Sequence, residues 1–346
     1  MQNKVLNLYP IDYPFETLVS RVNGGKLKLN PDFQRKYKWN KVNEEKTSRF
    51  IESILMRIPL PACYFAEDEE KKHIVIDGVQ RITTVKRFLN DEFALEGLTQ
   101  LDELNGKRFS ELEDLREDMN NYTIRCIILR KDNSKELIKD IFARLNQGAV
   151  ELTHQEIRHA IYPGKFNDLL IELGKNQIIV DFKGNTKKDE LEGSSKKDGL
   201  ENEEQILRFF AMLGDLADYE GNLTKYLDAF MEENQNACDE VINQYRVLFN
   251  DTIDKCTAVF DKEIIFKDTN KQKAKQSMVY YDLIMWSFKD YSIDFVKDNK
   301  NEIIKNFKEL CEMDELQKTL SGGTQNKGSI LRRRKLWKEK LEKIND

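Results

Sequence analysis

Two apolar spacings alternate along the first 130 residues of the chain. Spacings of three and four residues, typical of a helix with one buried face, cover residues 13–23, 50–58 and 82–89. Short apolar runs that favour strands lie between them, over residues 26–31, 62–66, 73–76 and 122–130. Because strands and helices alternate, this region predicts an α+β domain.

Helical spacing dominates from residue 136 onward. Helices are predicted over residues 136–145, after a capping box formed by Thr153 and Glu156, and over 206–216, 223–231 and 241–260. Residues 184–204 are dense in Lys, Asp, Glu, Gly and Ser, and they predict a mobile loop because they offer little apolar surface to bury. We therefore expect two domains, a mixed one over 1–135 and an all-α helical bundle over 136–346.

Composition narrows the class of protein. The formal net charge of -5 argues against a protein that coats nucleic acid through bulk charge, so any contact with DNA must be local. The five cysteines form no CxxC pair, so they suggest neither a disulfide framework nor a zinc site. No apolar stretch reaches the length of a membrane span, and the N-terminus lacks the apolar core of a signal peptide. We expect a cytoplasmic protein with no membrane contact.

The strongest local signal for chemistry is the segment Asp77-Gly78-Val79-Gln80-Arg81, between a predicted strand and a predicted helix. Backbone N–H groups and the helix dipole favour an anion at such a turn. Arg81 suits a phosphate, Gln80 offers a donor and an acceptor, and Asp77 suits a divalent metal. A structural alternative stays open, in which Asp77 caps the helix and Arg81 is exposed to solvent.

Cationic and aromatic side chains gather in a second segment, Gln34-Arg35-Lys36-Tyr37-Lys38-Trp39. Its cations suit phosphates and its aromatic rings suit stacking on a base. Alternatively, the tryptophan closes the core beneath cations that extend to solvent. The sequence leaves both interpretations open.

A basic helix is predicted over residues 327–343, at the C-terminal end of this sequence. Its cationic run suits contact with DNA phosphates and comprises Arg332, Arg333, Arg334 and Lys335. A solvated terminal helix that packs through Leu336 and Trp337 is the alternative.

Four ordered segments carry a family resemblance: FQRKYKW at 33–39, DGVQR at 77–81, FARLN at 142–146 and LTHQEIR at 152–158. They resemble the FQR-x-Y-x-W, DGQQR, F-x-R-L-N and L-T-x-Q-E-x-R motifs of the N-terminal domain family of GmrSD type IV restriction endonucleases. The resemblance implies a ParB/sulfiredoxin-like α+β domain whose DGQQR-type turn binds and hydrolyses a nucleoside triphosphate, such as GTP or ATP, with Mg²⁺ or another divalent cation. Val79 replaces the usual glutamine, which predicts weakened hydrolysis.

The resemblance also assigns roles to individual residues. The expected catalytic residues are Asp77, which would also bind the metal, Gln80 and Arg81. The expected nucleotide-binding residues are Gln34, Arg35, Gly78, Asn146 and Arg158. The basic charge of the two cationic segments, rather than the resemblance, gives the expected DNA-binding residues, which are Lys36 and Lys38, together with the cations of the C-terminal helix, Arg332, Arg333, Arg334 and Lys335.

Three functions follow as hypotheses. The first is an NTP-dependent component of an anti-phage restriction system that senses DNA, particularly modified foreign DNA, and controls a separately encoded HNH nuclease. It is favoured because an HNH site needs clustered histidines, whereas the only histidines here are His73, His154 and His159. The second is a self-sufficient, metal-dependent nicking nuclease, and the third is a non-enzymatic DNA-binding adaptor. A P-loop enzyme is excluded because no Walker A motif occurs, and a homo-oligomer is compatible with all three.

Overall fold

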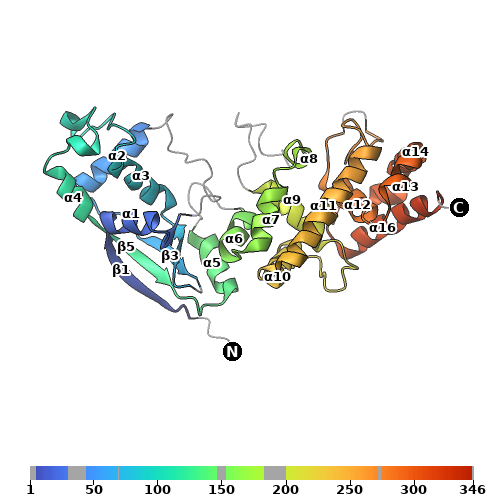
Figure 1. Ribbon diagram of the computed structural model, residues 1–346, viewed down its shortest axis with the longest axis horizontal. Coiled ribbons are helices and arrows are strands. Elements are labelled where there is room, and N and C mark those ends of the chain that lie inside the picture. The colour runs from blue at the N-terminus through green and yellow to red at the C-terminus, as the bar shows by residue number, and fades with distance from the viewer. Residues whose placement is uncertain are drawn as a thin grey trace. The chain divides into compact units, whose positions relative to one another are not determined.

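The computed structural model describes residues 5–29, 44–68, 70–145, 153–182, 200–271 and 274–344. Contacts within the chain divide it into an N-terminal unit, Met1–Ile161, and a helical unit, Tyr162–Asp346 (Figure 1). The predicted order, an α+β region followed by an all-α region, is confirmed. The sequence pattern placed the domain boundary at residue 136, where the mixed region gives way to helices alone. The contacts place the boundary after Ile161, so two further helices belong to the N-terminal unit.

A five-stranded mixed sheet forms the centre of the N-terminal unit, with the strand order β1-β5-β3-β4-β2. The strands are β1 (Leu8–Pro14), β2 (Leu27–Lys28), β3 (Cys63–Glu67), β4 (His73–Asp77) and β5 (Thr123–Leu129). Strand β3 runs parallel to β5 and antiparallel to β4. The sequence pattern missed β1 because Pro10 and Pro14 interrupt its apolar alternation, and an edge strand tolerates proline.

Four helices pack on one face of this sheet: α1 (Phe15–Asn23), α2 (Glu44–Leu55), α3 (Val79–Leu89) and α4 (Leu115–Asn121). Two 3-10 helices, Asp102–Leu104 and Phe109–Glu111, lie between α3 and α4 in the chain. The buried stripe predicted for residues 50–58 needs one correction. Helix α2 ends at Leu55, Arg57 follows with a positive φ, and Ile58 is 43% exposed.

Helices α5 (Lys135–Leu145) and α6 (His154–Ile161) pack on the other face of the sheet. Successive side chains of a strand point to opposite faces, so these helices meet strand residues that point away from the first four helices. Ile138, Phe142 and Ile157 share a hydrophobic cluster with Ile76 of β4 and Leu129 of β5. This packing explains why the N-terminal unit extends to Ile161. The predicted capping box of α6 is confirmed, since the Thr153 amide donates to Glu156 and the Glu156 amide donates to Oγ1 of Thr153.

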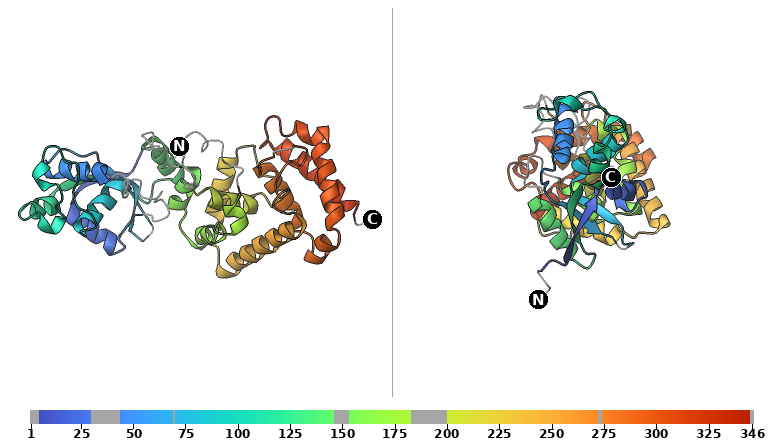
Figure 2. Two further views of the ribbon diagram at one scale, coloured as in Figure 1. Left: turned by 90° about the horizontal axis from the view of Figure 1, so that it is seen from above. Right: turned by 90° about the vertical axis from the view of Figure 1, so that its left-hand side faces the viewer.

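The helical unit begins with α7 (Lys165–Leu173), α8 (Gln177–Val180), α9 (Glu201–Ala211), α10 (Leu223–Asn234) and α11 (Asp239–Val259). It continues with α12 (Met278–Phe288), α13 (Ile293–Asp298), α14 (Lys300–Glu312), α15 (Asp314–Lys318) and α16 (Lys327–Glu342), which Figure 2 shows from two further directions. Helix α12 is apolar on most of its surface and packs against α9, α11 and α16. None of the helices in the described ranges has the length and apolarity that a membrane span requires.

The predicted loop over 184–204 is corrected at its C-terminal end. Residues 201–204 form the first turn of α9, whose acidic side chains Glu201, Glu203 and Glu204 favour the positive end of a helix. The prediction missed this helix start because it rested on the high content of charged and polar residues in the segment. Residues 184–199 of the prediction lie outside the described residues.

Candidate functional site

The turn between β4 and α3 is shaped by Gly78. Its φ is 106°, in the left-handed region, and it forms the N-cap of α3 directly after Asp77 ends β4. A Cβ at this position would lie 2.4 Å from Sγ of Cys63, the first residue of β3. Both the backbone conformation and the packing on β3 therefore require glycine here.

Arg81 ties this turn to the start of β3. Its Nη2 donates to Oδ2 of Asp77 at 2.5 Å and to the Ala62 carbonyl at 3.3 Å, and its Nη1 donates to the Pro61 carbonyl. The side chain of Arg81 is only 13% exposed, whereas the Asp77 carboxylate is 39% exposed. The structural alternative of a solvent-exposed Arg81 is therefore wrong, and further N–H groups of its guanidinium remain for an anion.

The N-terminal end of α3 carries uncompensated positive character. No side chain of the described residues caps its first turn, so Asp77 does not act as the helix cap. The first turn contains no acidic residue and does contain the Arg81 guanidinium. The helix dipole and the amides of the first turn add to that charge, and Asp77 is the only carboxylate of the described residues that is paired with Arg81. This arrangement favours an anion at the turn.

Buried polar atoms without hydrogen-bond partners mark the same helix. Oε1 of Gln80 and Oγ1 of Thr83 have no partner among the described residues, and Thr83 is only 8% exposed. Such atoms are rare in folded proteins, and a bound ligand or water is a usual explanation. Sequence reasoning missed Thr83, although a polar residue three positions after Gln80 and directly after Ile82 of the predicted apolar stripe was a usable signal.

Helix α6 supplies a second buried polar pair. Arg158 is 1% exposed, and its Nη1 donates to Oε1 of Gln155 at 3.1 Å. Nε2 of Gln155 has no acceptor within the described ranges. The neighbouring Ile157 belongs to the hydrophobic cluster that includes Ile76, the residue before Asp77. Gln155 is thus a further candidate that sequence reasoning did not single out.

Several predicted residues cannot be placed. The predicted nucleotide-binding residues Gln34, Arg35 and Asn146 lie outside the described residues, as do the predicted DNA-binding residues Lys36 and Lys38. Within the described part of the chain, no group of three His, Cys, Asp or Glu side chains forms a metal site. A divalent cation at Asp77 would therefore need ligands from phosphate, water or residues outside that part.

The cationic run of α16 requires a correction. Arg333 and Arg334 are only 4% and 6% exposed. Arg333 donates to the carbonyls of Thr319 and Thr324, and Arg334 donates to those of Gly214 and Met212. Burial lowers the pKa of both guanidiniums to about 10, which leaves them charged at neutral pH. Their predicted contact with DNA is not supported, because protein carbonyls take up their N–H groups.

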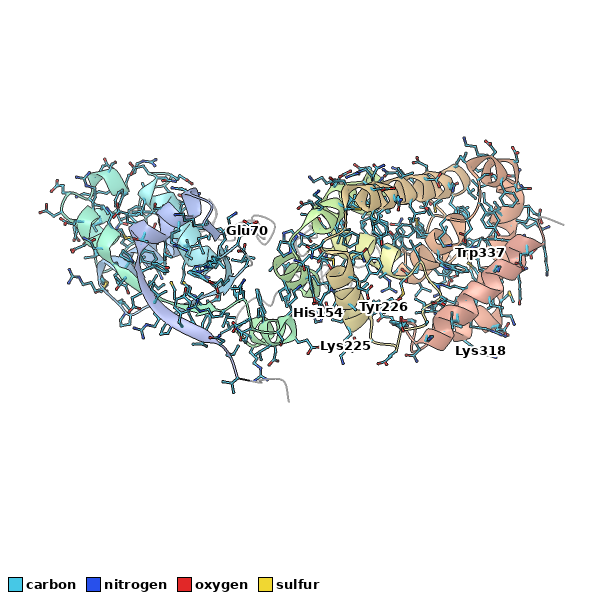
Figure 3. The ribbon with its side chains drawn as sticks, turned by 60° about the horizontal axis from the view of Figure 1, so that its bottom comes forward. Glu70, His154, Lys225, Tyr226, Lys318 and Trp337 are labelled. Atoms are coloured by element: carbon cyan, nitrogen blue, oxygen red, sulfur yellow. The ribbon has the colours of Figure 1, made fainter. Side chains whose placement is uncertain are left out.

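The remaining predicted cations of α16 are exposed and paired. Arg332 contacts Glu315, and Nζ of Lys335 lies 3.9 Å from Glu339. Trp337, labelled in Figure 3, is fully buried and donates to Oγ of Ser287 at 2.9 Å. The packing alternative for this helix, through Leu336 and Trp337, is therefore confirmed.

Comparison with known proteins identifies one family. Residues 15–163 match the family described as GmrSD restriction endonuclease, N-terminal domain. No curated protein and no solved structure matches the chain. The match begins at α1 and ends two residues after α6, so it covers nearly the whole N-terminal unit, including the Asp77 turn. Residues 15–163, less than half of the chain, are therefore similar to the N-terminal domain family of the GmrSD restriction endonucleases, and this similarity points to a part in a GmrSD-type restriction system.

Proposed function

We propose that the N-terminal unit binds a nucleoside triphosphate, with the phosphates at the start of α3. The observation that carries this proposal is the charge imbalance at the turn. The positive end of α3 and the Arg81 guanidinium lie together with a single described carboxylate, Asp77, in contact with Arg81. A polyphosphate supplies the missing negative charge and accepts hydrogen bonds from the free amides.

Each residue of the turn has a role in this proposal. Gly78 lets the phosphates approach the backbone, and Arg81 contributes its remaining N–H groups. Asp77 and phosphate oxygens hold Mg²⁺ or another divalent cation, and Asp77 also orients the water that attacks the terminal phosphate. Arg35, Gln34, Asn146 and Arg158 are proposed to add contacts to the same nucleotide. Hydrolysis is slow because Val79 lacks an amide side chain.

Nucleotide binding is proposed to regulate DNA restriction. In this proposal the chain senses modified foreign DNA and controls a separately encoded HNH nuclease. DNA meets Lys36, Lys38 and the exposed Arg332 and Lys335. Incubating the full chain with nucleotide, Mg²⁺ and modified or plain DNA distinguishes the hypotheses. Phosphate release without DNA cutting supports regulation of a partner, cutting supports a nicking nuclease, and neither supports an adaptor.

Substitution of Gly78 tests the phosphate site directly. Gly78→Ala introduces a Cβ against Cys63 and strains a left-handed backbone, so the turn must move. We expect nucleotide affinity in calorimetric titration to fall by at least about tenfold, the scale of one lost charge-assisted contact.

The matched control is Gly106→Ala. Gly106 also has a positive φ, 86°, but a Cβ there would meet nothing within 4 Å. This variant carries the same kind of backbone strain away from the turn and should keep wild-type affinity. Circular dichroism and thermal melting verify that both variants fold. A folded Gly78→Ala protein that binds nucleotide as tightly as wild type contradicts the proposal.

A further inference from the structure

Gln80 and Thr83 lie three residues apart on α3, so their side chains share one face of the helix. Oε1 of Gln80 and Oγ1 of Thr83 are both shielded from solvent, and neither has a hydrogen-bond partner in the described ranges. The two atoms lie within the first turn and a half of the helix that starts at Gly78. The proposed phosphate site and this unpaired polar pair are therefore consecutive along α3.

An unpaired hydroxyl is not the usual state of a buried threonine in this protein. Thr252, which is fully buried in α11, donates to the Leu248 carbonyl one turn earlier at 2.7 Å. This bond is the common way for a helical threonine to satisfy its hydroxyl. Thr84, the direct neighbour of Thr83, also has a partner. The hydroxyl of Thr83 differs from that of Thr252, because it has no hydrogen-bond partner in the described ranges.

The chemistry of the pair selects the ligand group. Oε1 of Gln80 only accepts a hydrogen bond, whereas Oγ1 of Thr83 both donates and accepts. A phosphate oxygen has no proton to donate to Gln80, so a second phosphate does not fit. A hydroxyl group fits, because it donates to Gln80 and accepts from Thr83 at once. In a nucleotide whose phosphates lie at the start of α3, the ribose is the next part of the molecule and carries such hydroxyls.

We propose that Gln80 and Thr83 bind a ribose hydroxyl and make the site selective for ribonucleotides. This inference rests on the proposed nucleotide site and adds the sugar that it selects. A deoxyribonucleotide would leave both buried atoms unpaired, and sites built to bind a hydroxyl discriminate against analogues that lack it. We expect wild-type protein to bind one deoxy analogue at least about tenfold more weakly than the matching ribonucleotide.

The test is calorimetric titration of the full chain with ATP and GTP and with their 2′-deoxy and 3′-deoxy forms, in the presence of Mg²⁺. Thr83→Val removes the hydroxyl and keeps the shape of the side chain. It should lower ribonucleotide affinity about tenfold, leave the affinity of the discriminated deoxy form unchanged, and abolish the preference. Because the hydroxyl is unpaired, the melting temperature should stay the same or rise.

Thr252→Val is the matched control, since it removes a buried hydroxyl that is paired. It should lower the melting temperature and leave nucleotide affinity and sugar preference unchanged. The inference is overturned if Thr83→Val keeps the wild-type preference. It is also overturned if wild type binds all sugar forms equally while Gly78→Ala abolishes binding, although the proposed phosphate site would then stand. If wild type binds no nucleotide, both proposals fail.

Discussion

Two arginines, Arg81 in the N-terminal unit and Arg334 in the helical unit, make the same kind of bond with opposite electrostatic results. Each donates to two backbone carbonyls, those of Pro61 and Ala62 for Arg81 and those of Met212 and Gly214 for Arg334. However, Arg81 lies at the positive start of α3, whereas Met212 is the C-cap of α9. Arg334 therefore meets a negative helix end, and Arg81 adds to a positive one.

The difference teaches which cations remain available to a ligand. Arg333 follows the same rule as Arg334, because one of its acceptors, Thr319, is the C-cap of α15. Cations at helix C-termini are satisfied by the fold, so a dense basic run can be structural. At the start of α3, by contrast, Asp77 pairs with Arg81, but no acidic residue of the first turn and no side-chain cap offsets the positive helix end, which stays available to an anion. The position of a cation relative to the helix ends thus decides its role more than the number of neighbouring cations.

The largest expected effect comes from Arg334→Ala. The substitution removes the donor to the carbonyls of the buried Met212 and the exposed Gly214, and it removes the guanidinium that lies 4.6 Å from the centre of the Trp286 ring. We expect the free energy of unfolding to fall by about 3 kcal/mol, the combined cost of lost charged hydrogen bonds and unpaired buried groups. Urea unfolding followed by tryptophan fluorescence measures the change.

Arg332→Ala provides the control from the adjacent position. Its side chain is 44% exposed and paired with Glu315, so removal should cost less than about 1 kcal/mol. Equal losses of stability in the two variants would contradict the structural role assigned to Arg334.

Much of the fold could be predicted from the spacing of apolar residues. The strands β3, β4 and β5 and the helices α3, α6 and α11 appear close to their predicted positions, because each has a clear period and a clear boundary residue. Strand β1 and the first turn of α9 were missed for a shared reason. Their local composition, prolines in β1 and charged residues in α9, favours irregular structure, and contacts with the rest of the fold stabilise the regular structure instead.

The candidate site was only partly predictable. The order strand, glycine, helix is readable in the sequence, and it located the Asp77 turn. Local sequence does not reveal that Arg81 reaches back to β3, or that Thr83 lacks the bond that Thr252 makes. It also could not distinguish Arg332 from Arg333 and Arg334, because burial depends on the helices that α16 packs against. Such distinctions require the three-dimensional arrangement.

A smaller effect is expected from Arg81→Lys, which keeps the positive charge but loses the planar guanidinium and its several N–H donors. A single ammonium cannot reach the carbonyls of Pro61 and Ala62 and the Asp77 carboxylate together. We expect about 1–2 kcal/mol of lost stability and about a tenfold loss in nucleotide affinity. Denaturant unfolding and calorimetry provide the two measurements.

Asp77→Asn complements this test, because it removes negative charge from the same turn. Inorganic phosphate should bind this variant more tightly in the absence of metal, while stimulation of nucleotide binding by Mg²⁺ should disappear. Weaker phosphate binding by Asp77→Asn would show that the turn does not carry the excess positive charge described above.

The smallest expected effect lies at the opposite end of β4, where His73 is buried beside Arg21. Nδ1 of His73 lies 3.3 Å from Nη2 of Arg21, and the ring is 4% exposed. Burial, and then the Arg21 charge, lower the pKa of His73; Arg130 acts in the same direction, while Glu67 and Asp68 oppose it. Folded His73 therefore stays neutral at a pH where the unfolded chain, with an ordinary pKa near 6.5, takes up a proton.

This linkage predicts that the N-terminal unit loses stability as the pH falls through about 6.5, with a limiting slope of about 1.4 kcal/mol per pH unit for one proton. His73→Phe removes the titrating group, and its ring can pack beside Phe65 as the imidazole does. The slope of unfolding free energy between about pH 7.5 and 5.5 should therefore flatten in this variant. An unchanged slope would mean that burial and the Arg21 charge do not oppose protonation of His73 in the folded protein.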